Sequence, residues 1–482
     1  MQRRHLLAAS GLGALSLSAP ALLRAQSAKE VPAIWDVIVV GAGGAGLAAA
    51  VAATQAGAKH VLVLERGFTL GGHTILSTGF MGAIQRDPRE SPERWEKTIE
   101  SSMALFEKVG EGRGNPVLVR KLLAESGAAV DWLTSLGLVW VKQSFYSLGG
   151  ISEQSHVSSL VRAGYDYVVT LKKAASRFGA EIHLRSQVRE LVTDAQGTIR
   201  GVRTEEDGTL HHYAAHAVVL ATGGFGANVP MRMKYDSRLD ARFKTTANPY
   251  DKTVDFSLGD GILMAEAIGA ATVDMDAIQT IPFWGGRLTD YVGADIFLDT
   301  KGERFVNEAA SWKTIANALW KEPNQSCWVI TDSQSVKGAS RSVKLMNGTV
   351  REAQTIDEMA QGMGVAADKL KATIDRYNQF VKAGVDTDFG KKIFTQDISQ
   401  APFYYGKDRL YVHYCCGGLK FDEKARVLKA DGTPIAGLFA AGEVTGGLHG
   451  ADRVGGWSIT DCMVFGRTAG TSAVAYGQMM KG

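Results

Sequence analysis

Apolar runs alternate with a helical segment near the start of the folded part of the sequence. Residues 36–40 and 61–64 are short, continuous or nearly continuous apolar runs, which is the pattern of buried strands. Between them, the segment that follows residue 46 is rich in alanine, a strong helix former. A strand, a helix and a second strand in this order predict a βαβ unit, and therefore a parallel sheet in a protein of the α/β class.

The pattern further along the chain predicts a second domain. Apolar positions at helical spacing mark residues 91–140, and several strands follow between residues 181 and 226. From about 275 to 414, short strands mix with amphipathic helices. Because 482 residues are too many for one core, we expect an α+β domain at 275–414, inserted into a larger domain made of residues 35–274 and 415–482.

The first 28 residues have the composition of a targeting segment. Arg3 and Arg4 precede a mildly apolar stretch at residues 6–23, and cleavage is plausible after Ala25. This arrangement predicts a twin-arginine signal peptide at residues 1–28, export in the folded state and a periplasmic location. No other segment approaches the length of a membrane span, so we do not expect an integral membrane protein after cleavage.

Charge and cysteine content exclude several classes of partner and cofactor. The net charge is +3 and there is no basic run, so the sequence does not favour a nucleic-acid partner. The four cysteines form neither C-x-x-C nor C-x-x-C-H, so we expect no c-type haem, zinc or iron–sulfur site.

A glycine fingerprint follows the first strand. Gly41, Gly43 and Gly46 form G-x-G-x-x-G at the start of the alanine-rich helix, and Glu65 ends the second strand at the spacing of a ribose-binding carboxylate. The free N–H groups and the dipole of a helix N-terminus favour a pyrophosphate. A strand that runs into residues 222–224 predicts a second approach of the backbone to the same ligand. The sequence therefore predicts a dinucleotide site.

A second glycine-rich loop lies near the end of the chain, at residues 437–456. Glycines at this density let the backbone approach a flat ligand. The loop carries Glu443 and Arg453, and a charged arginine in such a loop needs a partner because a buried unpaired charge is costly. We expect that partner to be an anionic ligand.

Several motifs occur in the order found in one flavoprotein family. The chain resembles the flavoprotein subunit of fumarate reductases and succinate dehydrogenases, especially the soluble periplasmic flavocytochrome-type reductases. The matching segments are residues 36–50, 221–226, 259–261, 302–308 and 386–390. The resemblance implies a Rossmann-type FAD-binding domain with an inserted α+β clamp domain. In that family, hydride passes from flavin N5 to one carbon of an unsaturated acid, and an acid protonates the other carbon.

The resemblance also assigns the residues that hold FAD. They lie in the two glycine-rich regions, in the segment after Gly71 and in the strand ends that approach the nucleotide. They are Gly41, Gly43, Gly44, Gly46, Glu65, Gly72, His73, Thr74, Thr222, Gly223, Gly224, Asp260, Glu443 and Gly456. His73 stands where membrane-bound succinate dehydrogenases attach FAD covalently, so a covalent link and a non-covalent hydrogen bond both remain open.

Departures from the family pattern change the expected substrate. Arg453 matches the arginine that binds a substrate carboxylate, but Ile281, Phe283 and Trp312 are apolar or aromatic where dicarboxylate enzymes present polar groups. Tyr414 replaces a second carboxylate-binding histidine. A fumarate-sized diacid would leave one charge unpaired, at a cost of several kcal/mol. We therefore expect a small carboxylic acid with one carboxylate, and not fumarate.

The source of the proton stays open because Trp312 occupies the place of the family's acid arginine. Tyr414 is one candidate to replace the arginine as proton donor, since a phenol beside a positive charge can transfer a proton. The alternative is that Tyr414 only forms an aromatic wall of the substrate site. His413, Arg287 and Tyr291 are further candidates.

The direction of the reaction and the electron donor are also open. Reduction of a C=C bond is the favoured reading, and a dehydrogenase that desaturates an acid or ketone is the first alternative. A FAD-bearing electron carrier without catalysis is the second. Because the chain has no haem motif, we expect electrons from a separate donor such as a c-type cytochrome.

Overall fold

The computed structural model describes residues 34–140, 155–156, 163–249, 251–282, 285–288, 292–335 and 341–480. The predicted signal peptide, Phe283 and Tyr291 lie outside these ranges. From Ile34 onward the chain forms one compact unit. Among the described residues, no helix combines the length and the apolar composition needed to cross a bilayer.

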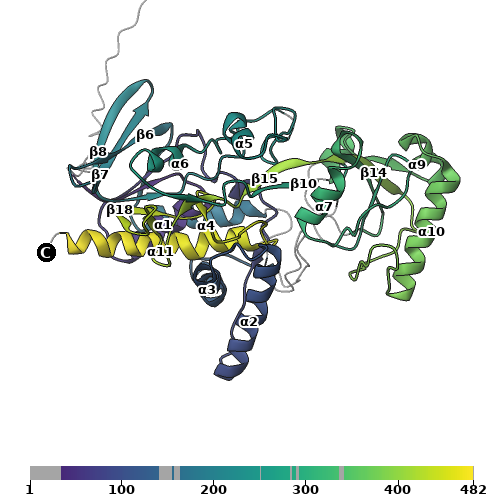
Figure 1. Cartoon of the computed structure of the whole chain (residues 1–482), viewed down its shortest axis with the longest axis horizontal. Helices are drawn as coiled ribbons and strands as arrows, with labels where there is room; N and C mark the ends of the chain where they lie inside the picture. Colours follow the sequence, from purple (N-terminus) through teal and green to yellow (C-terminus); the bar gives the residue numbers. More distant parts are fainter. Residues whose placement is uncertain are drawn as a thin grey trace, which may run out of the picture. The chain divides into compact units, whose positions relative to one another are not determined.

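The main sheet confirms the predicted parallel α/β arrangement. Its central strand β1 is parallel to β2 on one side and to β8 on the other, and β8 is parallel to β18 (Figure 1). The side chains of β2 are almost fully buried, which explains its uninterrupted apolar sequence. The strands of the path, in spatial order, are β17 (Arg426–Leu428), β18 (Pro434–Ala440), β8 (Thr209–Leu220), β1 (Trp35–Val40), β2 (Val61–Leu64) and β5 (Glu181–His183).

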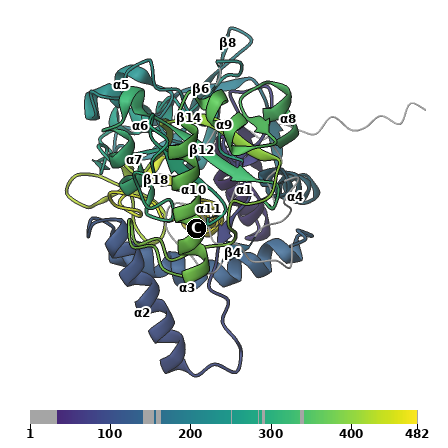
Figure 2. The ribbon, with the colours of Figure 1, turned by 90° about the vertical axis from the view of Figure 1, so that its right-hand side faces the viewer.

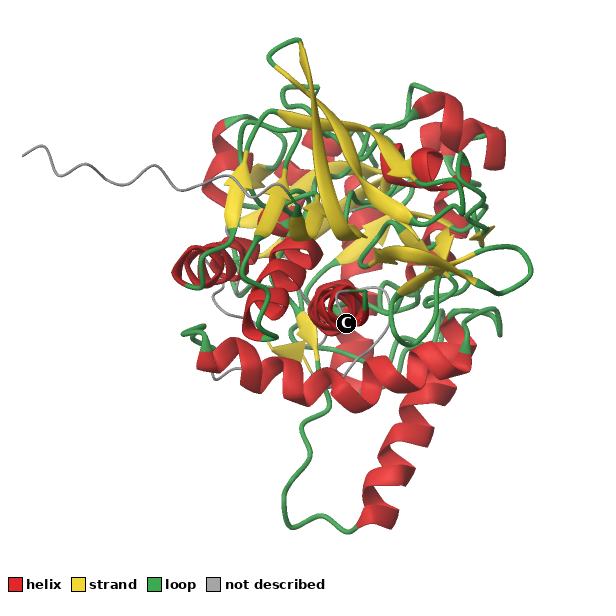
Figure 3. Cartoon of the chain, turned by 90° about the vertical axis from the view of Figure 1, so that its left-hand side faces the viewer, coloured by secondary structure: helices red, strands yellow, loops and turns green. Residues whose placement is uncertain are grey.

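Two long apolar helices cover one face of this sheet. The first is α1 (Gly44–Gln55), which follows the fingerprint, and the second is α11 (Trp457–Met479), which ends the described chain. They pack closely because small residues meet: a Cβ on Gly466 or Gly470 would come within 2.6 or 2.2 Å of a backbone oxygen of α1. Figure 3 looks along α11 and shows it beneath the strands. The C-terminal helix therefore supports the helix that starts at the nucleotide fingerprint.

Further helices and strands complete the part of the structure that surrounds the main sheet. Helices predicted over 91–140 are confirmed as α2 (Pro92–Val109) and α3 (Pro116–Ser135), each started by a capping side chain and a proline. The strands β6 (Ser186–Thr193) and β7 (Ile199–Glu206) pair antiparallel with each other, and β7 pairs with β8. Helix α4 (Gly164–Arg177) packs against α1, whereas α5 (Val229–Tyr235) and α6 (Asp260–Glu266) contribute to the core on the other face of the sheet.

A second group of elements lies between β10 (Ile278–Ile281) and β15 (Tyr411–Cys415). These two strands pair antiparallel and carry the chain into and out of this group. An antiparallel sheet and several helices make it an α+β arrangement, as expected (Figure 2). The limits 275 and 414 stay predictions. The elements are β11 (Ile296–Leu298), α7 (Trp312–Leu319), β12 (Ser326–Asp332), α8 (Arg341–Met346), β13 (Arg351–Ala353), α9 (Ile356–Met363), α10 (Ala367–Ala383) and β14 (Phe403–Arg409).

Candidate active site

The turn between β1 and α1 explains why the fingerprint needs glycine. Gly41 has φ +103°, and a Cβ there would lie 2.3 Å from the Ala221 oxygen. A Cβ on Gly46 would lie 1.9 Å from the Gly41 oxygen. At Gly43 the nearest atom, the Gly71 oxygen, would be 3.9 Å away, which is an ordinary van der Waals contact. Gly41 and Gly46 thus close the turn, whereas Gly43 borders a cleft.

That cleft has a volume of about 620 Å³ and extends from the fingerprint to the glycine loop near residue 442. Helix α1 begins in it with Gly43 as N-cap and without a capping side chain. The Gly44 N–H donates to Thr74 Oγ1 at 3.1 Å, and the positive end of the helix dipole favours an anion at this place. Glu65 accepts hydrogen bonds from Ala42 N (2.9 Å) and Gly67 N (2.7 Å), and its oxygens retain lone pairs for a further donor.

Two buried hydroxyl groups without a hydrogen-bond partner among the described residues indicate whether a dinucleotide fits this cleft. Thr222 Oγ1 and Ser257 Oγ are buried and have no hydrogen-bond partner among the described residues. Both residues line the cleft. Buried polar groups normally have a partner, so the residues present fit a ligand with hydrogen-bonding groups along its length, as FAD has.

The structure brings most of the predicted cofactor residues together. Gly46 and Gly224 lie behind the lining, where a Cβ would strike Gly41 or Glu443, and Gly456 lines the neighbouring cavity. Those that line the cleft are Gly41, Gly43, Gly44, Glu65, Gly72, His73, Thr74, Thr222, Gly223, Asp260 and Glu443.

Some lining residues were missed by the sequence analysis. Arg66 pairs with Asp260 across the cleft, and it directly follows the predicted carboxylate, which was a usable signal. Residues 186–188 and 255–257 also line the cleft. No pattern in the sequence marked these two segments, because they come from a strand start and an irregular loop.

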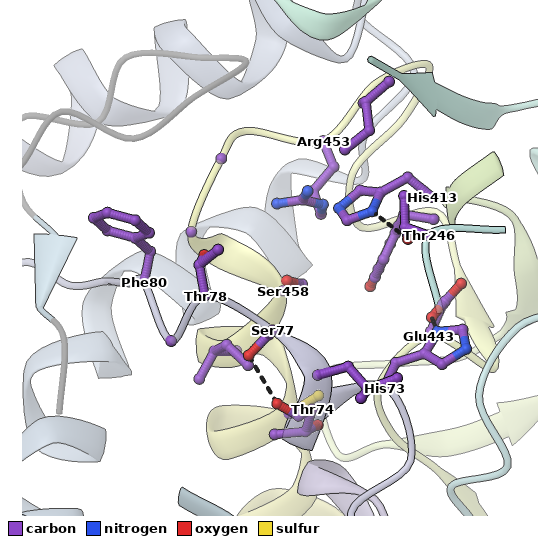
Figure 4. A pocket seen from close by; sticks show the side chains of 18 of the residues that line it. His73, Thr74, Ser77, Thr78, Phe80, Thr246, His413, Glu443, Arg453 and Ser458 are labelled. Carbon is purple, nitrogen blue, oxygen red and sulfur yellow. Dashed lines mark hydrogen bonds and ion pairs between the residues drawn. The ribbon is translucent and has the colours of Figure 1, made fainter. Parts of the chain in front are cut away.

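A second cavity, of about 160 Å³, adjoins the cleft. The two share His73, Thr74, Leu76, Ala247, Glu443 and Cys462 in their linings. In Figure 4, Arg453 and His413 point into the cavity from one side, with His73 and Glu443 on another. A ligand in this cavity would therefore meet the end of a ligand in the cleft.

Arg453 contributes a buried guanidinium to the lining of the small cavity. Its side chain is buried, donates to Gln279 Oε1 and to the Val454 oxygen at 3.1 Å each, and leaves Nε without a partner. Among the described residues no carboxylate forms an ion pair with it. A buried guanidinium without a counter-ion favours binding of an anion.

The other walls of the cavity are largely apolar. Trp312, in the first turn of α7, is 3 % exposed, and Ile281, at the end of β10, is 1 % exposed. Leu76, Phe80 and Ile459 complete this side. The predicted replacement of polar groups by Ile281 and Trp312 therefore gives a wall without a second cation.

His413 and Tyr414 lie side by side on β15 and both line the cavity. Burial, aided by the Arg453 and His73 charges, lowers the pKa of His413 well below its usual value. Its Nδ1 lies 2.9 Å from Thr246 Oγ1. Burial and the Asp461 carboxylate raise the pKa of Tyr414 well above its usual value, with Arg453 acting in the opposite direction. His413 is thus neutral, and Tyr414 keeps its proton.

Arg287 is not brought to the cavity. It is buried, pairs with Asp295 at 2.9 Å and lines neither the cleft nor the cavity. Its guanidinium lies 5.9 Å from the centre of the Trp312 ring. The geometry therefore gives it a structural role behind Trp312.

His73 lies between two carboxylates at the junction of cleft and cavity. Its Nε2 is 2.8 Å from Asp255 and its Nδ1 is 3.6 Å from Glu443. Burial of the ring opposes protonation, but Asp255 and Glu443 outweigh it and raise the pKa of His73 well above its usual value. The ring is therefore a cation whose two nitrogens both face acids.

Fold, glycine turn and paired cavities define an FAD-binding flavoprotein. The family model described as an FAD binding domain matches residues 36–459. The chain is 35 % identical to the urocanate reductase of Eggerthella lenta over 464 residues, which cover 91 % of this chain and 74 % of that protein. It is 30 % identical to the acrylate reductase flavoprotein subunit of Shewanella woodyi, with 97 % of each chain covered.

A solved structure agrees with these relatives. The open conformation of a flavocytochrome c3 fumarate reductase superposes with a TM-score of 0.70 at 30 % identity, covering 92 % of this chain and 78 % of that one. The chain belongs to the fumarate reductase/succinate dehydrogenase flavoprotein family. The expected FAD cofactor and the class of FAD-dependent oxidoreductase acting on C–C double bonds are thereby confirmed.

Proposed function

We propose that this protein reduces the C=C bond of an α,β-unsaturated monocarboxylate. One observation carries the proposal: Arg453 is a buried guanidinium that forms no ion pair with a carboxylate among the described residues, whereas the other cation of the cavity, His73, is already paired with two carboxylates. Arg453 shares the cavity lining with the apolar side chains of Ile281 and Trp312. In this arrangement Arg453 binds the carboxylate and thereby fixes where the adjacent double bond lies. FAD, when bound, supplies the hydride to that bond. The apolar wall excludes water and holds the rest of the substrate.

A diacid such as fumarate fits this cavity poorly. Its second carboxylate would face the apolar wall without a partner. An uncompensated buried charge costs about 3–5 kcal/mol, which corresponds to a loss of affinity on the order of 10²–10⁴-fold. Acrylate, named for the Shewanella woodyi relative, carries one carboxylate, and this supports the same conclusion.

The size of the cavity favours a substrate with an apolar substituent. An engineered apolar cavity of about 150 Å³ accommodates a benzene ring, and the present cavity is about 160 Å³. An alkyl or aryl group on the carbon far from the carboxylate would contact Phe80 and Trp312 and displace water from them.

A panel of acids tests the proposal. FAD-loaded protein is reduced anaerobically with a viologen and mixed with enoates that carry one carboxylate or two, and reoxidation of the viologen is followed. We expect turnover of monocarboxylates at least 100-fold above that of fumarate. The same panel of saturated acids, with a dye as acceptor, tests the desaturation alternative. Lack of reoxidation by every enoate would refute the reductase assignment.

The Arg453→Gln variant tests the carboxylate site itself. It removes the cation and leaves a side chain of similar length, so we expect the affinity for enoates to fall by about 10²–10³-fold, because a charged hydrogen-bonded contact is lost. The matched control is Arg467→Gln, since Arg467 lies on α11 against Trp132 and lines neither cavity. Equal affinity in both variants would exclude Arg453 as the anchor.

We further propose that FAD is held without a covalent link. Both nitrogens of His73 face carboxylates, so neither is a free nucleophile. Acid-precipitated protein should have the mass of the polypeptide alone. A mass increased by one flavin would contradict this.

The location and the electron donor belong to the same proposal. Arg3 and Arg4 ahead of an apolar stretch support export by the twin-arginine route, and the lack of a C-x-x-C-H motif supports a separate donor, a c-type cytochrome. Replacement of both arginines by lysine should keep the protein in the cytoplasm, as measured by cell fractionation. A reduced periplasmic cytochrome should be reoxidised only when protein and enoate are both present.

A further inference from the structure

A buried polar cluster lies directly behind the cavity wall. Tyr414, on β15, donates a hydrogen bond to Asp461 Oδ2 at 3.3 Å. His449 Nε2 lies 3.9 Å from the same oxygen, and the rings of Tyr414 and His449 meet edge to face at 5.6 Å between centres. Asp461 and His449 are 1 % and 4 % exposed. The three side chains thus form a row that leads from the cavity into the protein.

The cluster is incompletely satisfied, which distinguishes it from a purely structural network. Asp461 Oδ1 and both ring nitrogens of His449 are buried without a hydrogen-bond partner in the described part of the chain. Unsatisfied buried groups are uncommon and often mark functional sites or ordered water. Of the three residues, only Tyr414 lines the cavity. Asp461 and His449 are therefore separated from a bound substrate by Tyr414.

The charges around Tyr414 explain why its phenol must be reprotonated by a neighbour after it gives up a proton. Burial and Asp461, followed by Glu443 and Cys462, raise the pKa of Tyr414, and Arg453 alone lowers it. The Arg453 guanidinium lies 5.1 Å from the centre of the Tyr414 ring. A phenolate would therefore stand beside the Asp461 carboxylate in a buried place. Such a pair of like charges is unstable, so the phenol must be reprotonated at once.

His449 leads toward the surface. Its loop lies against the turn between α2 and α3, where Ala451 N donates to the Gly110 oxygen at 3.0 Å and Asn115 N donates to the Gly447 oxygen at 2.7 Å. Glu111 and Arg113 in that turn are exposed. The backbone on either side of His449 therefore packs against a turn that carries exposed residues.

We propose that Tyr414, Asp461 and His449 form a proton relay that serves the reduction of the double bond. The Tyr414 O–H bond breaks as its proton forms a bond to the substrate carbon next to the carboxylate. The imidazolium form of His449 then gives a proton to the Asp461 carboxylate, Asp461 passes it to the Tyr414 oxygen, and solvent returns a proton to the neutral imidazole of His449. The relay moves protons only, while the hydride belongs to the reductase activity proposed above, on which this inference rests. Tyr414 is the catalytic acid; Asp461 and His449 are positioning residues.

A double-mutant cycle tests the relay in the FAD-loaded protein. The rate of flavin reoxidation by a saturating monocarboxylic enoate is measured in a single turnover, in H₂O and in D₂O, for wild type, Tyr414→Phe, Asp461→Asn and the double variant. We expect each single variant to lose about 10²–10³-fold, the range of general acid catalysis. Because the residues act as one unit, the double variant should be no slower than Tyr414→Phe. His449→Gln should lose about tenfold.

The controls separate a relay from a structural effect. The Kd for a saturated monocarboxylate should stay within twofold of wild type in Asp461→Asn, and the large solvent isotope effect of wild type should disappear. Tyr476→Phe removes a tyrosine hydroxyl from α11, the helix that also carries Asp461, at a place where Tyr476 packs on Phe439. This variant should react like wild type.

Two results would overturn the relay. One is an Asp461→Asn rate within twofold of wild type, and the other is losses that multiply in the double variant. If wild type itself reacts with no enoate, the proposed function fails and the relay falls with it. If wild type reacts and Asp461→Asn reacts equally fast, only the relay fails.

Discussion

Single residues in this site owe their charge to their neighbours, as two histidines show. His73 faces Asp255 and Glu443 and is held as a cation. His413 is buried near Arg453 and is held neutral. Both rings line the same cavity. The site therefore presents one protonated and one neutral imidazole at the same pH, a division that the sequence alone does not specify.

The raised pKa of His73 makes stability depend on pH in a definite direction. A group whose pKa is higher in the folded state than in the unfolded state stabilises the fold fully below its unfolded value, near 6.5, and loses this contribution as the pH rises through the folded value. We expect the thermal midpoint of wild type to fall above pH 6.5 relative to that of His73→Gln. Calorimetry of both proteins across neutral and alkaline pH measures this difference, and parallel curves would contradict it.

At this scale the sequence predicted some residues and missed others for physical reasons. Arg453 was predicted because glycines surround it and leave it as the evident charge of the loop. Arg287 was proposed as a candidate from its position in the chain, but its partner Asp295 is eight residues away in a buried turn. Asp461 was missed, because its place in an apolar helix gave no sign that it meets Tyr414, 47 residues away.

At the scale of the elements, the contact between α1 and α11 leaves no space for a side chain at two glycines of α11. In an ordinary helix, replacement of glycine by alanine is stabilising by about 1 kcal/mol. At Gly470 we expect the opposite, a loss of about 1–3 kcal/mol, because the new Cβ would lie 2.2 Å from the Ala49 oxygen. Urea unfolding of Gly470→Ala measures the loss, and FAD affinity should fall as α1 is displaced.

The same helix supplies a control for this prediction. At Gly477 a Cβ would lie 3.3 Å from the His216 side chain, and the nearest backbone atom, the Asp36 oxygen, would be 3.9 Å away. Gly477→Ala should therefore be neutral or slightly stabilising and should bind FAD like wild type. A Gly470→Ala protein as stable as Gly477→Ala would show that the two helices can separate without cost.

Local elements were more predictable than their pairing. The strands β1 and β2 and the helices α2 and α3 follow from apolar periodicity, which is a local property. The pairing of β10 with β15 joins residues more than a hundred positions apart with a register shift. No local pattern sets that register, so the meeting of Ile281 and Tyr414 in one cavity emerges only from the fold.

At the scale of the whole molecule, the cavity depends on contacts between distant segments. Arg453 belongs to the C-terminal glycine loop, whereas Ile281 ends β10 and Trp312 begins α7. Asp452 joins the two, since it accepts hydrogen bonds from the Gln279 side chain and from Lys313 N, the latter at 3.0 Å. Asp452 is therefore expected to set the distance between the cation and the apolar wall.

Removal of Asp452 should loosen the cavity without affecting the nucleotide cleft. In Asp452→Ala the buried amide of Gln279 and the Lys313 N–H lose their acceptor, at a cost of about 1–3 kcal/mol. We expect monocarboxylates to bind roughly tenfold more weakly and the preference over fumarate to shrink, because the wall can move and admit water. FAD affinity should stay unchanged, since Asp452 does not line the cleft.

The control is Asp276→Ala, whose partner Arg113 is about one-third exposed and whose ion pair is worth about 0–1 kcal/mol. Titration of each variant with acids, followed by flavin absorbance, gives both affinities; unchanged selectivity in Asp452→Ala would show that the wall is held by other contacts.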